Sequence, residues 1–380
     1  MRILSIMSNS FRAFRAVLMR LWRREPTQLI LIITAILFGC MLLIGWSTLS
    51  RPELAIPEAP VYWSAVKVFS DPTVAPGSSD QRLCDTPDTL YPTGTGTWYD
   101  LCPANNGLFV SVLAADHTLL RGPSSLGESF SACSGAVLSS HDLVVLCHTS
   151  SALTLHVVDT IGRPHTPIAI SGRADLSGLA VDPSGRLHVG WLDPQAGSIW
   201  TVHYATYSGD STVLDSGAAL PADNIIGVIH VSADHLLGDF ALGIDAHTVY
   251  AIWADSSAPY GPGSDVPGVI YALTFPLDKP NNVQQITIAQ NMQSWNVPLV
   301  ISDHTLALPL AAASKDNAPA VAFLVNGKTA RIDVFSSPLT ELFRRPYLTK
   351  QADGSLSLQW SVWTADQREI SYVSTTRSFP

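Results

Sequence analysis

Short runs of alternating apolar and polar residues, separated by tight turns that carry Asp or Gly, recur from the middle of this chain to its end. The alternation has the period of a half-buried β-strand. Four of the turns lie at intervals of roughly 50 to 60 residues, centred on Asp182, Asp245, Asp303 and Asp353. Repetition at this interval, with about four strands in each repeat, is typical of propeller blades. The pattern therefore predicts an all-β chain with a β-propeller fold.

Two further turns extend the count of blades. Residues 105–107 and 140–142 are interpreted as additional turns between the first and second strands of a blade, which predicts six blades. Residues 225–240 could instead contribute to a seventh blade. A strand over residues 61–69 is expected to complete the last blade, because closure of the ring shields the edge strands.

An uncharged apolar run precedes the repeats. Leu29 to Trp46 is long enough to cross the roughly 30 Å hydrocarbon core of a membrane as a helix. Six arginines and one glutamate come before the run, so the positive-inside rule places the N-terminus in the cytoplasm. We predict a basic amphipathic cytoplasmic segment (1–27), a transmembrane helix acting as a signal anchor (28–47), a stalk (48–60) and an extracytoplasmic propeller (61–380). The chain is then a single-pass protein of the cell membrane.

Two alternatives remain open for this N-terminal region. A cleaved signal peptide is one, although the basic region is long and no Ala-x-Ala site follows the apolar run. Lipidation at Cys40 is the other, although Phe38 is bulky and further apolar residues follow the cysteine.

The external part contains four cysteines, which is an even number in a compartment where thiols oxidise. We expect local pairing, Cys84 with Cys102 and Cys133 with Cys147. The second pairing is favoured because residues 136–147 have the pattern of a hairpin that brings strand ends together. Four cysteines nevertheless allow three connectivities.

Charge and spacing limit the possible partners. Without its six N-terminal arginines and Glu25 the chain carries 16 basic and 30 acidic residues, and an acidic domain of this kind is a poor nucleic-acid binder. No CxxC or HxxxH motif occurs, so we predict no metal site and no cofactor, with Ca2+ left as a possibility for the acidic loops. Asp-His pairs recur in the chain but are interpreted as turn chemistry.

In the usual propeller wiring, the loops between second and third strands share one rim with the connections between blades. This rim normally carries the binding site, and the longest of its loops between second and third strands spans residues 255–268. The predicted ligand-binding residues are Asp193, Asp255, Tyr260, Asp265, Asp316 and Asp366. The alternative is that these aspartates only shape turns on an exposed rim.

A tryptophan near the end of the second strand, a polar loop and strands such as residues 198–206, 268–275 and 369–375 make the repeat resemble six-bladed sialidase-like (BNR-type) propellers over about residues 105–377. That resemblance implies an arginine triad, a tyrosine with a glutamate, and an aspartate as acid/base. The blade-to-blade connections contain residues that could fill these roles: Asp175, Glu341, Tyr347, Arg121, Arg173 and Arg345. The chain lacks the family's Asp boxes and its Phe-Arg-Ile-Pro segment.

Aspartate-lined loops would repel a carboxylated sugar, which favours binding over sialidase activity. We therefore predict a membrane-anchored extracellular propeller that acts as a binding or interaction module for a glycan, peptide or protein. The alternative function is a sialidase-like glycoside hydrolase acting on extracellular glycans. A purely structural spacer is the third class, since propellers host many unrelated functions.

Overall fold

The computed structural model describes residues 60–70, 90–93, 95–104, 107–114, 118–127, 130, 132–149, 152–172, 174–207, 224–231, 235–257, 268–312, 318–336, 342–351, 353–363 and 369–376. The chain divides into two compact units, Met1–Ala55 and Ile56–Pro380, and all described residues belong to the second. Every regular element among them is a β-strand, and none of them forms a helix that could cross a membrane. The predicted cytoplasmic segment, transmembrane helix and nearly all of the stalk lie outside these residues.

The described residues form 24 strands. The first twelve are β1 (Lys67–Ser70), β2 (Leu90–Pro92), β3 (Trp98–Ala104), β4 (Gly107–Leu113), β5 (Leu119–Gly127), β6 (Ala132–Val137), β7 (Leu143–His148), β8 (Leu153–Val158), β9 (Ile168–Ser171), β10 (Leu176–Val181), β11 (Leu187–Gln195) and β12 (Ile199–Tyr207). The others are β13 (Asn224–His230), β14 (Leu236–Ile244), β15 (Thr248–Ser256), β16 (Gly268–Pro276), β17 (Gln284–Trp295), β18 (Leu299–Ser302), β19 (Thr305–Ala312), β20 (Pro319–Val325), β21 (Lys328–Val334), β22 (Leu342–Lys350), β23 (Leu356–Trp363) and β24 (Glu369–Thr375).

All strand pairings are antiparallel, and the strands fall into groups of four along the chain. The groups β2–β5, β6–β9 and β10–β13 are separate sheets in sequence order, and β22–β24 form a fourth sheet with β1. The groups β14–β17 and β18–β21 are joined into one larger sheet because the end of β17 pairs with β19. Below, these groups are numbered first (β2–β5) to sixth (β22–β24 with β1).

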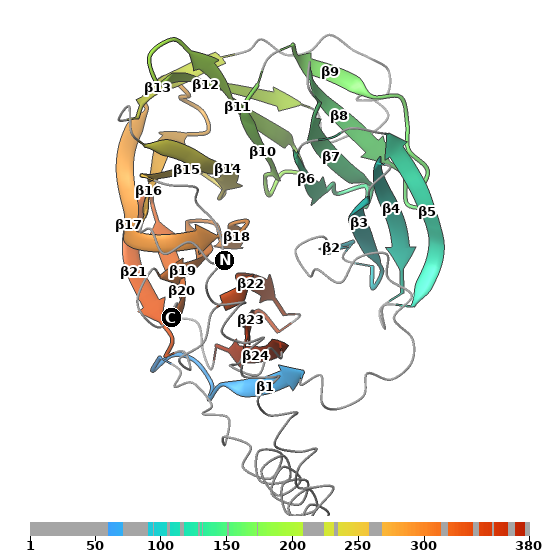
Figure 1. Ribbon diagram of the computed structural model, residues 1–380, viewed down its shortest axis with the longest axis vertical. Coiled ribbons are helices and arrows are strands. Elements are labelled where there is room, and N and C mark those ends of the chain that lie inside the picture. The colour runs from blue at the N-terminus through green and yellow to red at the C-terminus, as the bar shows by residue number, and fades with distance from the viewer. Residues whose placement is uncertain are drawn as a thin grey trace, which may run out of the picture. The chain divides into compact units, whose positions relative to one another are not determined.

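Successive groups contact each other through their first strands, β6 against β10, β10 against β14, β14 against β18 and β18 against β22. Figure 1 shows these strands turned toward the middle of the arrangement, with the later strands of each group farther out. Antiparallel four-stranded sheets packed side by side around their first strands are a β-propeller, as the sequence predicted.

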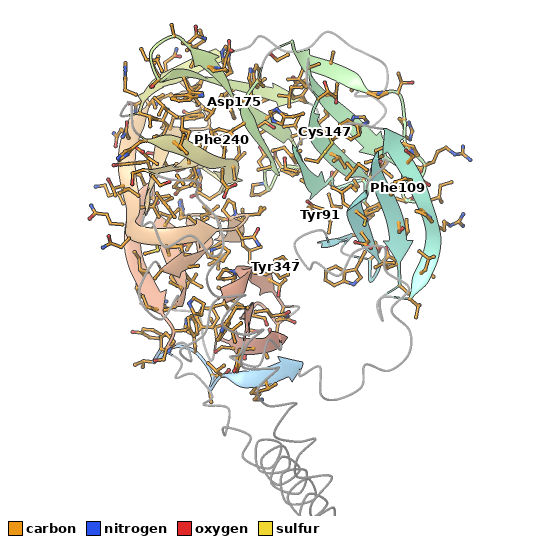
Figure 2. The ribbon with its side chains drawn as sticks, viewed as in Figure 1. Tyr91, Phe109, Cys147, Asp175, Phe240 and Tyr347 are labelled. Atoms are coloured by element: carbon orange, nitrogen blue, oxygen red, sulfur yellow. A yellow bond between two sulfur atoms is a disulfide. The ribbon has the colours of Figure 1, made fainter. Side chains whose placement is uncertain are left out.

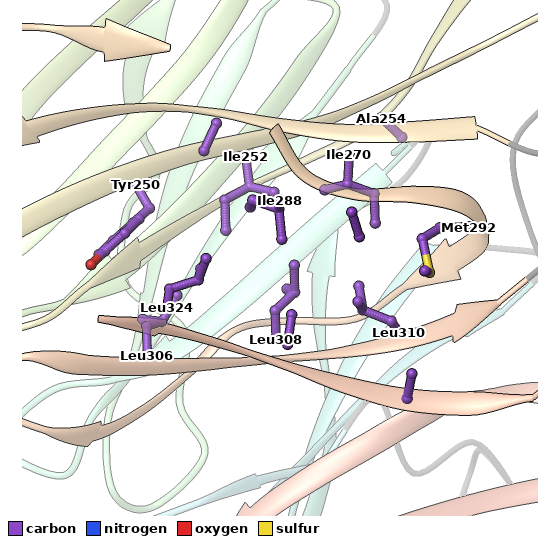
Figure 3. Close-up of a cluster of buried hydrophobic side chains, with 14 residues drawn as sticks. Tyr250, Ile252, Ala254, Ile270, Ile288, Met292, Leu306, Leu308, Leu310 and Leu324 are labelled. Carbon is purple, nitrogen blue, oxygen red and sulfur yellow. The ribbon is translucent and has the colours of Figure 1, made fainter. Parts of the chain in front are cut away.

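Neighbouring groups bury an apolar core between them. The second and third groups share a cluster that includes Leu146, Leu155 and Val189, and the third and fourth share one that includes Val202 and Phe275. Figure 3 shows the cluster between the fourth and fifth groups, where Ile252, Ile270 and Ile288 face Leu306, Leu308 and Leu310. Strands in this position are buried on both faces, which is why their sequences are nearly continuous apolar runs.

Close approach of the first strands depends on glycine at one position. A Cβ atom built on Gly178 in β10 would lie 2.7 Å from the Cα of Ala241 in β14. No side chain fits at that distance without moving one of the two backbones. Gly178 therefore fixes how closely the third group packs against the fourth.

The predicted turns are largely confirmed, with one exception. Residues 140–142, Asp182, Asp245, Asp303 and Asp353 all lie between the first and second strands of a group. Residues 105–107 do not, because they join β3 to β4. In the first group the turn between the first two strands, β2 and β3, is built on Thr93. Its hydroxyl accepts a hydrogen bond from the N–H of Thr95 and donates one to the carbonyl of Thr97. Threonine replaces aspartate there, so the aspartate pattern missed the turn. Residues 225–240 supply parts of β13 and β14.

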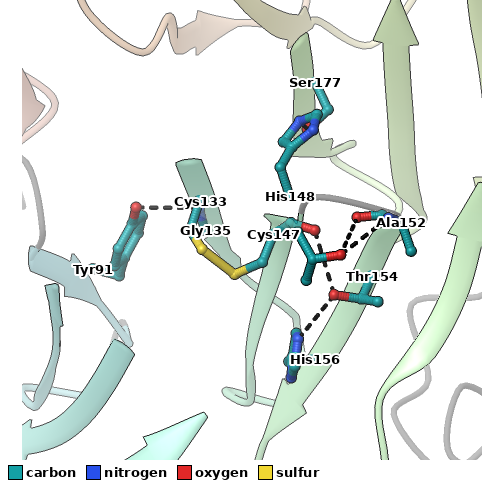
Figure 4. Close-up of a disulfide and its surroundings, with 10 residues drawn as sticks. Tyr91, Cys133, Gly135, Cys147, His148, Ala152, Thr154, His156 and Ser177 are labelled. Atoms are coloured by element: carbon teal, nitrogen blue, oxygen red, sulfur yellow. Dashed lines mark hydrogen bonds between the residues drawn. A yellow bond between two sulfur atoms is a disulfide. The ribbon is translucent and has the colours of Figure 1, made fainter. Parts of the chain in front are cut away.

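One disulfide is confirmed within the described residues. Cys133 and Cys147 lie directly opposite each other on β6 and β7 and are bonded (Figure 4). Cys102 is also disulfide-bonded, but Cys84, its predicted partner, lies outside the described residues. That pairing stays a prediction.

Strand β1 and the segment before it close the last group, as expected from the sequence, although only the end of the predicted strand 61–69 is regular. Lys67 and Val68 pair with Val373 and Tyr372 of β24. Ahead of them Trp63 is almost fully buried and packs edge-on against Phe335. The residue that follows, Ser64, donates its N–H to the carbonyl of Thr375. A strand from the start of the propeller therefore completes the sheet made by its end.

A buried carboxylate ties this segment to the fifth group. Asp333 of β21 accepts from the indole N–H of Trp63 at 3.0 Å and pairs with Nε of Arg331 at 3.0 Å. The guanidinium of Arg331 in turn lies between the rings of Tyr62 and Phe323, 4.5 Å from each centroid. We call this set, Tyr62, Trp63, Phe323, Arg331 and Asp333, the closure cluster.

Replacing Asp333 with alanine should lower the free energy of unfolding by about 2 kcal/mol, because it leaves the Trp63 indole N–H without its acceptor and the Arg331 guanidinium without its ion-pair partner. Urea denaturation followed by tryptophan fluorescence measures this. The exposed ion pair of Asp278 with Lys279 offers a control, and Asp278→Ala should leave the midpoint unchanged. Equal midpoints for Asp333→Ala and the unmodified protein would show that the closure cluster is not stabilising.

Candidate functional site

One rim of the propeller collects polar side chains from neighbouring groups. Strand directions place the connections between groups on the same rim as the loops between second and third strands, because β11 runs toward this rim and β12 and β10 run away from it. We call it the upper rim. The N–H of Val231, at the start of the connection from β13 to β14, donates to the carbonyl of Ser198 in the β11–β12 loop. That bond joins a connection to a loop, as the wiring predicts.

Two of the six predicted ligand-binding residues lie in the described part of the chain. Asp193 lies near the end of β11 and Asp255 near the end of β15, both on the upper rim. Tyr260, Asp265, Asp316 and Asp366 lie outside the described residues. The expectation that they bind a ligand stays a prediction.

Asp255 is paired with a histidine that the sequence did not single out as a site residue. Its Oδ1 lies 2.7 Å from Nδ1 of His235, and the two side chains keep 17% and 35% of their surface exposed. An ionised carboxylate can only accept hydrogen bonds, so Nδ1 of His235 donates to Asp255. A carboxylate that fixes one imidazole nitrogen in this way is common where histidine binds ligands or transfers protons.

A second carboxylate lies at the start of the third group. Asp175 precedes β10, its side chain is exposed, and its Oδ2 accepts from the indole N–H of Trp200 at 3.3 Å. Trp200 is partly buried and packs against the core between the third and fourth groups, as does Tyr271 of β16. Figure 2 shows Asp175 on the third group and Phe240 on the adjoining fourth.

The third polar pair joins the second and third groups. Nε2 of His148, the last residue of β7, lies 2.7 Å from the hydroxyl of Ser177 in β10 (Figure 4). The same imidazole hydrogen-bonds the backbone of Ala174. Burial lowers the pKa of His148, while that hydrogen bond and the nearby Asp175 carboxylate act against the shift. His148 is therefore held neutral near pH 7.

The residues implied by the sialidase resemblance are more scattered than expected. Arg121, Arg345 and Tyr347 were expected in connections between blades but lie within strands, the first in β5 and the others in β22. Strand β5 is the last of its group, so Arg121 is exposed on the outside. Asp175 and Tyr347 belong to the third and sixth groups (Figure 2). Arg173 and Glu341 lie outside the described residues.

Tryptophans expected to pack between blades do so. Trp191, Trp253 and Trp360 are almost fully buried, which excludes them as exposed sugar platforms. Trp191 stacks on His203 with the ring centroids 5.1 Å apart, and Trp253 stacks on Tyr271. The side chain of Trp363 lies outside the described residues.

Polar residues on the opposite rim serve the turns. Asp182 accepts from the N–H groups of Ser184 and Arg186 and from Nε2 of the fully buried His188. Burial acts to raise the pKa of Asp182, but its hydrogen bonds from Ser184, Arg186 and His188 outweigh burial and lower it. His188 also bonds the hydroxyl of Tyr204 at 2.5 Å, and burial lowers its pKa. This network stabilises the β10–β11 turn from inside the core.

Metal binding finds no support in the described part of the chain, where no group of three or more histidine, cysteine or acidic residues could hold an ion. The Asp-His pair at Asp303 and His304 lies in a turn, as expected. His304 stacks on His247 of the neighbouring turn with the ring centroids 4.4 Å apart. Asp116 and His117 lie outside the described residues, as does Asp234.

Comparisons with known proteins give the fold and no family. No protein-family model and no curated protein matches the sequence. A protein of unknown function from Dyadobacter fermentans DSM 18053 superposes with a TM-score of 0.51 at 9% identity, covering 82% of this chain and 99% of that one. An ulvan lyase of polysaccharide lyase family PL25 gives 0.46 at 8% identity (72% and 79% covered), and a chain of a nidogen/laminin complex gives 0.42 at 14% identity (70% and 86% covered). At 9% identity the likeness to the Dyadobacter protein shows the fold alone.

Buried neutral histidines make the stability depend on pH. Burial lowers the pKa values of His148, His156 and His188 in the folded protein, so below about pH 6.5 the unfolded chain binds more protons than the folded one. The free energy of unfolding should be fully retained above pH 7 and should fall as the pH drops below 6.5, by at most about 1.4 kcal/mol per pH unit for each histidine. Urea denaturation between pH 7.5 and 5 measures this slope. His156→Gln should reduce it, whereas Val145→Ala should lower the free energy equally at every pH, and identical slopes in all three proteins would contradict the argument.

Proposed function

We propose that this chain is a membrane-anchored propeller of six blades that binds an extracytoplasmic ligand on its upper rim. The six groups of four strands are the six blades, with the fourth and fifth joined by the pairing of β17 with β19. The uncharged run from Leu29 to Trp46 is the anchor, and the arginines before it set the orientation. Since β1 begins shortly after that run, the anchor and the closing strand are neighbours in sequence.

The observation that carries the binding role is the His235–Asp255 pair. The pair is partly exposed, and it lies next to the longest of the loops that join second to third strands. A carboxylate that keeps an imidazole oriented reduces the entropy lost when a ligand is bound. On the opposite rim, by contrast, Asp182 and Asp245 are buried and occupied by their own turns.

The chemistry of the upper rim favours a ligand rich in hydroxyl or cationic groups. Carboxylates at Asp175 and Asp255 accept hydrogen bonds and repel anions, Trp200 provides aromatic surface beside Asp175, and Tyr271 packs on the same core between the third and fourth groups. Neutral or amino-substituted glycans and basic peptides have these properties. Uronic and sialic acids do not, which argues against the sialidase-like alternative.

Asp255→Asn should weaken binding to an oligosaccharide or basic peptide selected from arrays by about tenfold or more, because the variant removes a charge-assisted hydrogen bond and one negative charge. Titration of the purified full chain in detergent measures the dissociation constant. His235→Gln should produce a similar loss.

Asp303→Asn is the matched control, since Asp303 is an exposed aspartate on the opposite rim. It should bind as the unmodified protein does. Equal affinity of the Asp255 and Asp303 variants would remove the upper rim from the binding role, and turnover of a fluorogenic sialoside by the same preparation would favour the hydrolase instead.

A further inference from the structure

We propose that Ser177 and His148 are a nucleophile and its general base, and that the upper rim hydrolyses carboxylic esters. This activity goes beyond the binding role and does not depend on the His235–Asp255 pair. It rests on a contact between two groups of strands that lie far apart in sequence and meet only in the folded propeller.

The hydrogen bonds around His148 have the order that nucleophilic catalysis requires. The bond to the Ala174 backbone favours the charged imidazole, so the ring donates to the carbonyl of Ala174; because Nε2 faces Ser177, we assign that donor proton to Nδ1. Nε2 of the neutral ring then carries a lone pair, and the Ser177 hydroxyl donates to it across 2.7 Å. Serine, base and orienting acceptor are the three parts of a catalytic triad, with a backbone carbonyl in the place of the acid.

A carboxylate is also near the base. Asp175 lies close enough to His148 to favour its protonated form, although burial has the larger effect. The indole N–H of Trp200 donates to this carboxylate. The backbone N–H of Asp175 donates to the carbonyl of Leu192. The Asp175 carboxylate therefore favours the imidazolium that forms during the reaction.

The position of the pair allows access to a substrate. Ser177 lies at the start of β10, on the upper rim and in the first strand of its group, and its side chain is partly exposed while His148 is buried. One edge of β10 pairs with β11, and the other has no strand paired to it within the described sheets. Backbone N–H groups on such an edge are the donors that can stabilise an oxyanion.

Two other hydroxyl–imidazole contacts in the protein show why this one is singled out. Thr154 contacts His156 at 3.1 Å and Tyr204 contacts His188, but both histidines and Tyr204 are buried in the core. The secondary hydroxyl of threonine, crowded by the methyl group on the same carbon, and a phenol inside the core are poor nucleophiles for an external substrate. Only the Ser177 pair, among the described contacts of this type, combines a primary hydroxyl with partial exposure.

The reaction proceeds in two balanced halves. The Ser177 oxygen attacks the ester carbon while its proton moves to Nε2 of His148, and the bond from carbon to the leaving oxygen breaks as that proton passes to the alcohol. Water then attacks the acyl-serine, gives its proton to His148, and releases the carboxylic acid as the proton returns to Ser177. Water is the only co-reactant.

The test uses a fluorophosphonate as the reagent. The Ser177 oxygen bonds to its phosphorus, fluoride leaves, and His148 takes up the hydroxyl proton. Incubation of the purified full chain in detergent should add one phosphonyl group per chain, and fragmentation of the peptide that covers residues 174–186 should place it on Ser177. Ser177→Ala should abolish the adduct, and His148→Gln should slow its formation by about 100-fold or more. Thr154→Val, which removes the hydroxyl of the Thr154–His156 contact in the second group, should be labelled at the same rate as the unmodified protein.

Localisation on the unmodified protein needs no variant, so loss of folding in a variant cannot hide the result. An adduct on Ser177 supports the proposal if it forms on the folded protein and does not form on protein that was heat-denatured before the reagent was added. Absence of an adduct from folded protein, or an adduct on another serine, overturns it and leaves a structural bond between two groups. Labelling of folded His148→Gln at the unmodified rate overturns the role of the base.

Discussion

Closure of the ring is the constraint on which the rest of this structure depends. The last three strands of the chain cannot make a four-stranded group by themselves, and β1 supplies the missing strand from the other end of the propeller. Without it, one edge of β24 would present unpaired backbone groups to water. The closure cluster strengthens this junction by placing Trp63 on the Asp333 carboxylate of the preceding group. Two separate groups are thus held by the same short segment.

Close packing of the first strands determines which polar residues can meet. Gly178 lets β10 approach β14 at a distance that no larger residue permits, and the residue before it, Ser177, faces the second group. Successive residues of a strand point to opposite faces, so one position packs against the fourth group while its neighbour contacts His148. The Cys133–Cys147 disulfide fixes the end of β7 one residue before that histidine. The polar contact of the upper rim is therefore a result of core packing.

The fold could be predicted from local pattern because each repeat is a short-range unit. The turns at Asp182, Asp245 and Asp353 bond to N–H groups two to four residues away, so their sequence is sufficient to identify them. The disulfide of Cys133 with Cys147 is equally local, closing a single hairpin. The turn at Thr93 was missed because a threonine hydroxyl makes the same bonds as an aspartate, and a threonine is a much weaker signal in a sequence rich in that residue.

The candidate site could not be predicted in the same way, because its contacts join distant segments. His148 and Ser177 are 29 positions apart, and Asp175 and Trp200 are 25 apart, with no spacing rule that links either pair. His235 was visible in the sequence as part of an Asp-His pair, but the partner that the structure gives it is Asp255, 20 positions away. The Asp-His pattern in the sequence indicated a turn, whereas folding brings the carboxylate of Asp255 to His235 from the next strand of the group.

The two rims differ in a way that has a physical cause. On the opposite rim Asp182 and Asp245 are buried and occupied by the backbone of their own tight turns, which leaves them little capacity for a ligand. On the upper rim the chain passes from one group to the next, so polar side chains there are paired across groups or with a strand of the same group, and Ser177, His235 and Asp255 keep part of their surface exposed. Such pairs are held by the packing of rigid sheets and not by a turn. They can keep their geometry while a ligand or substrate replaces water around them, which is the property that a functional site on a propeller requires.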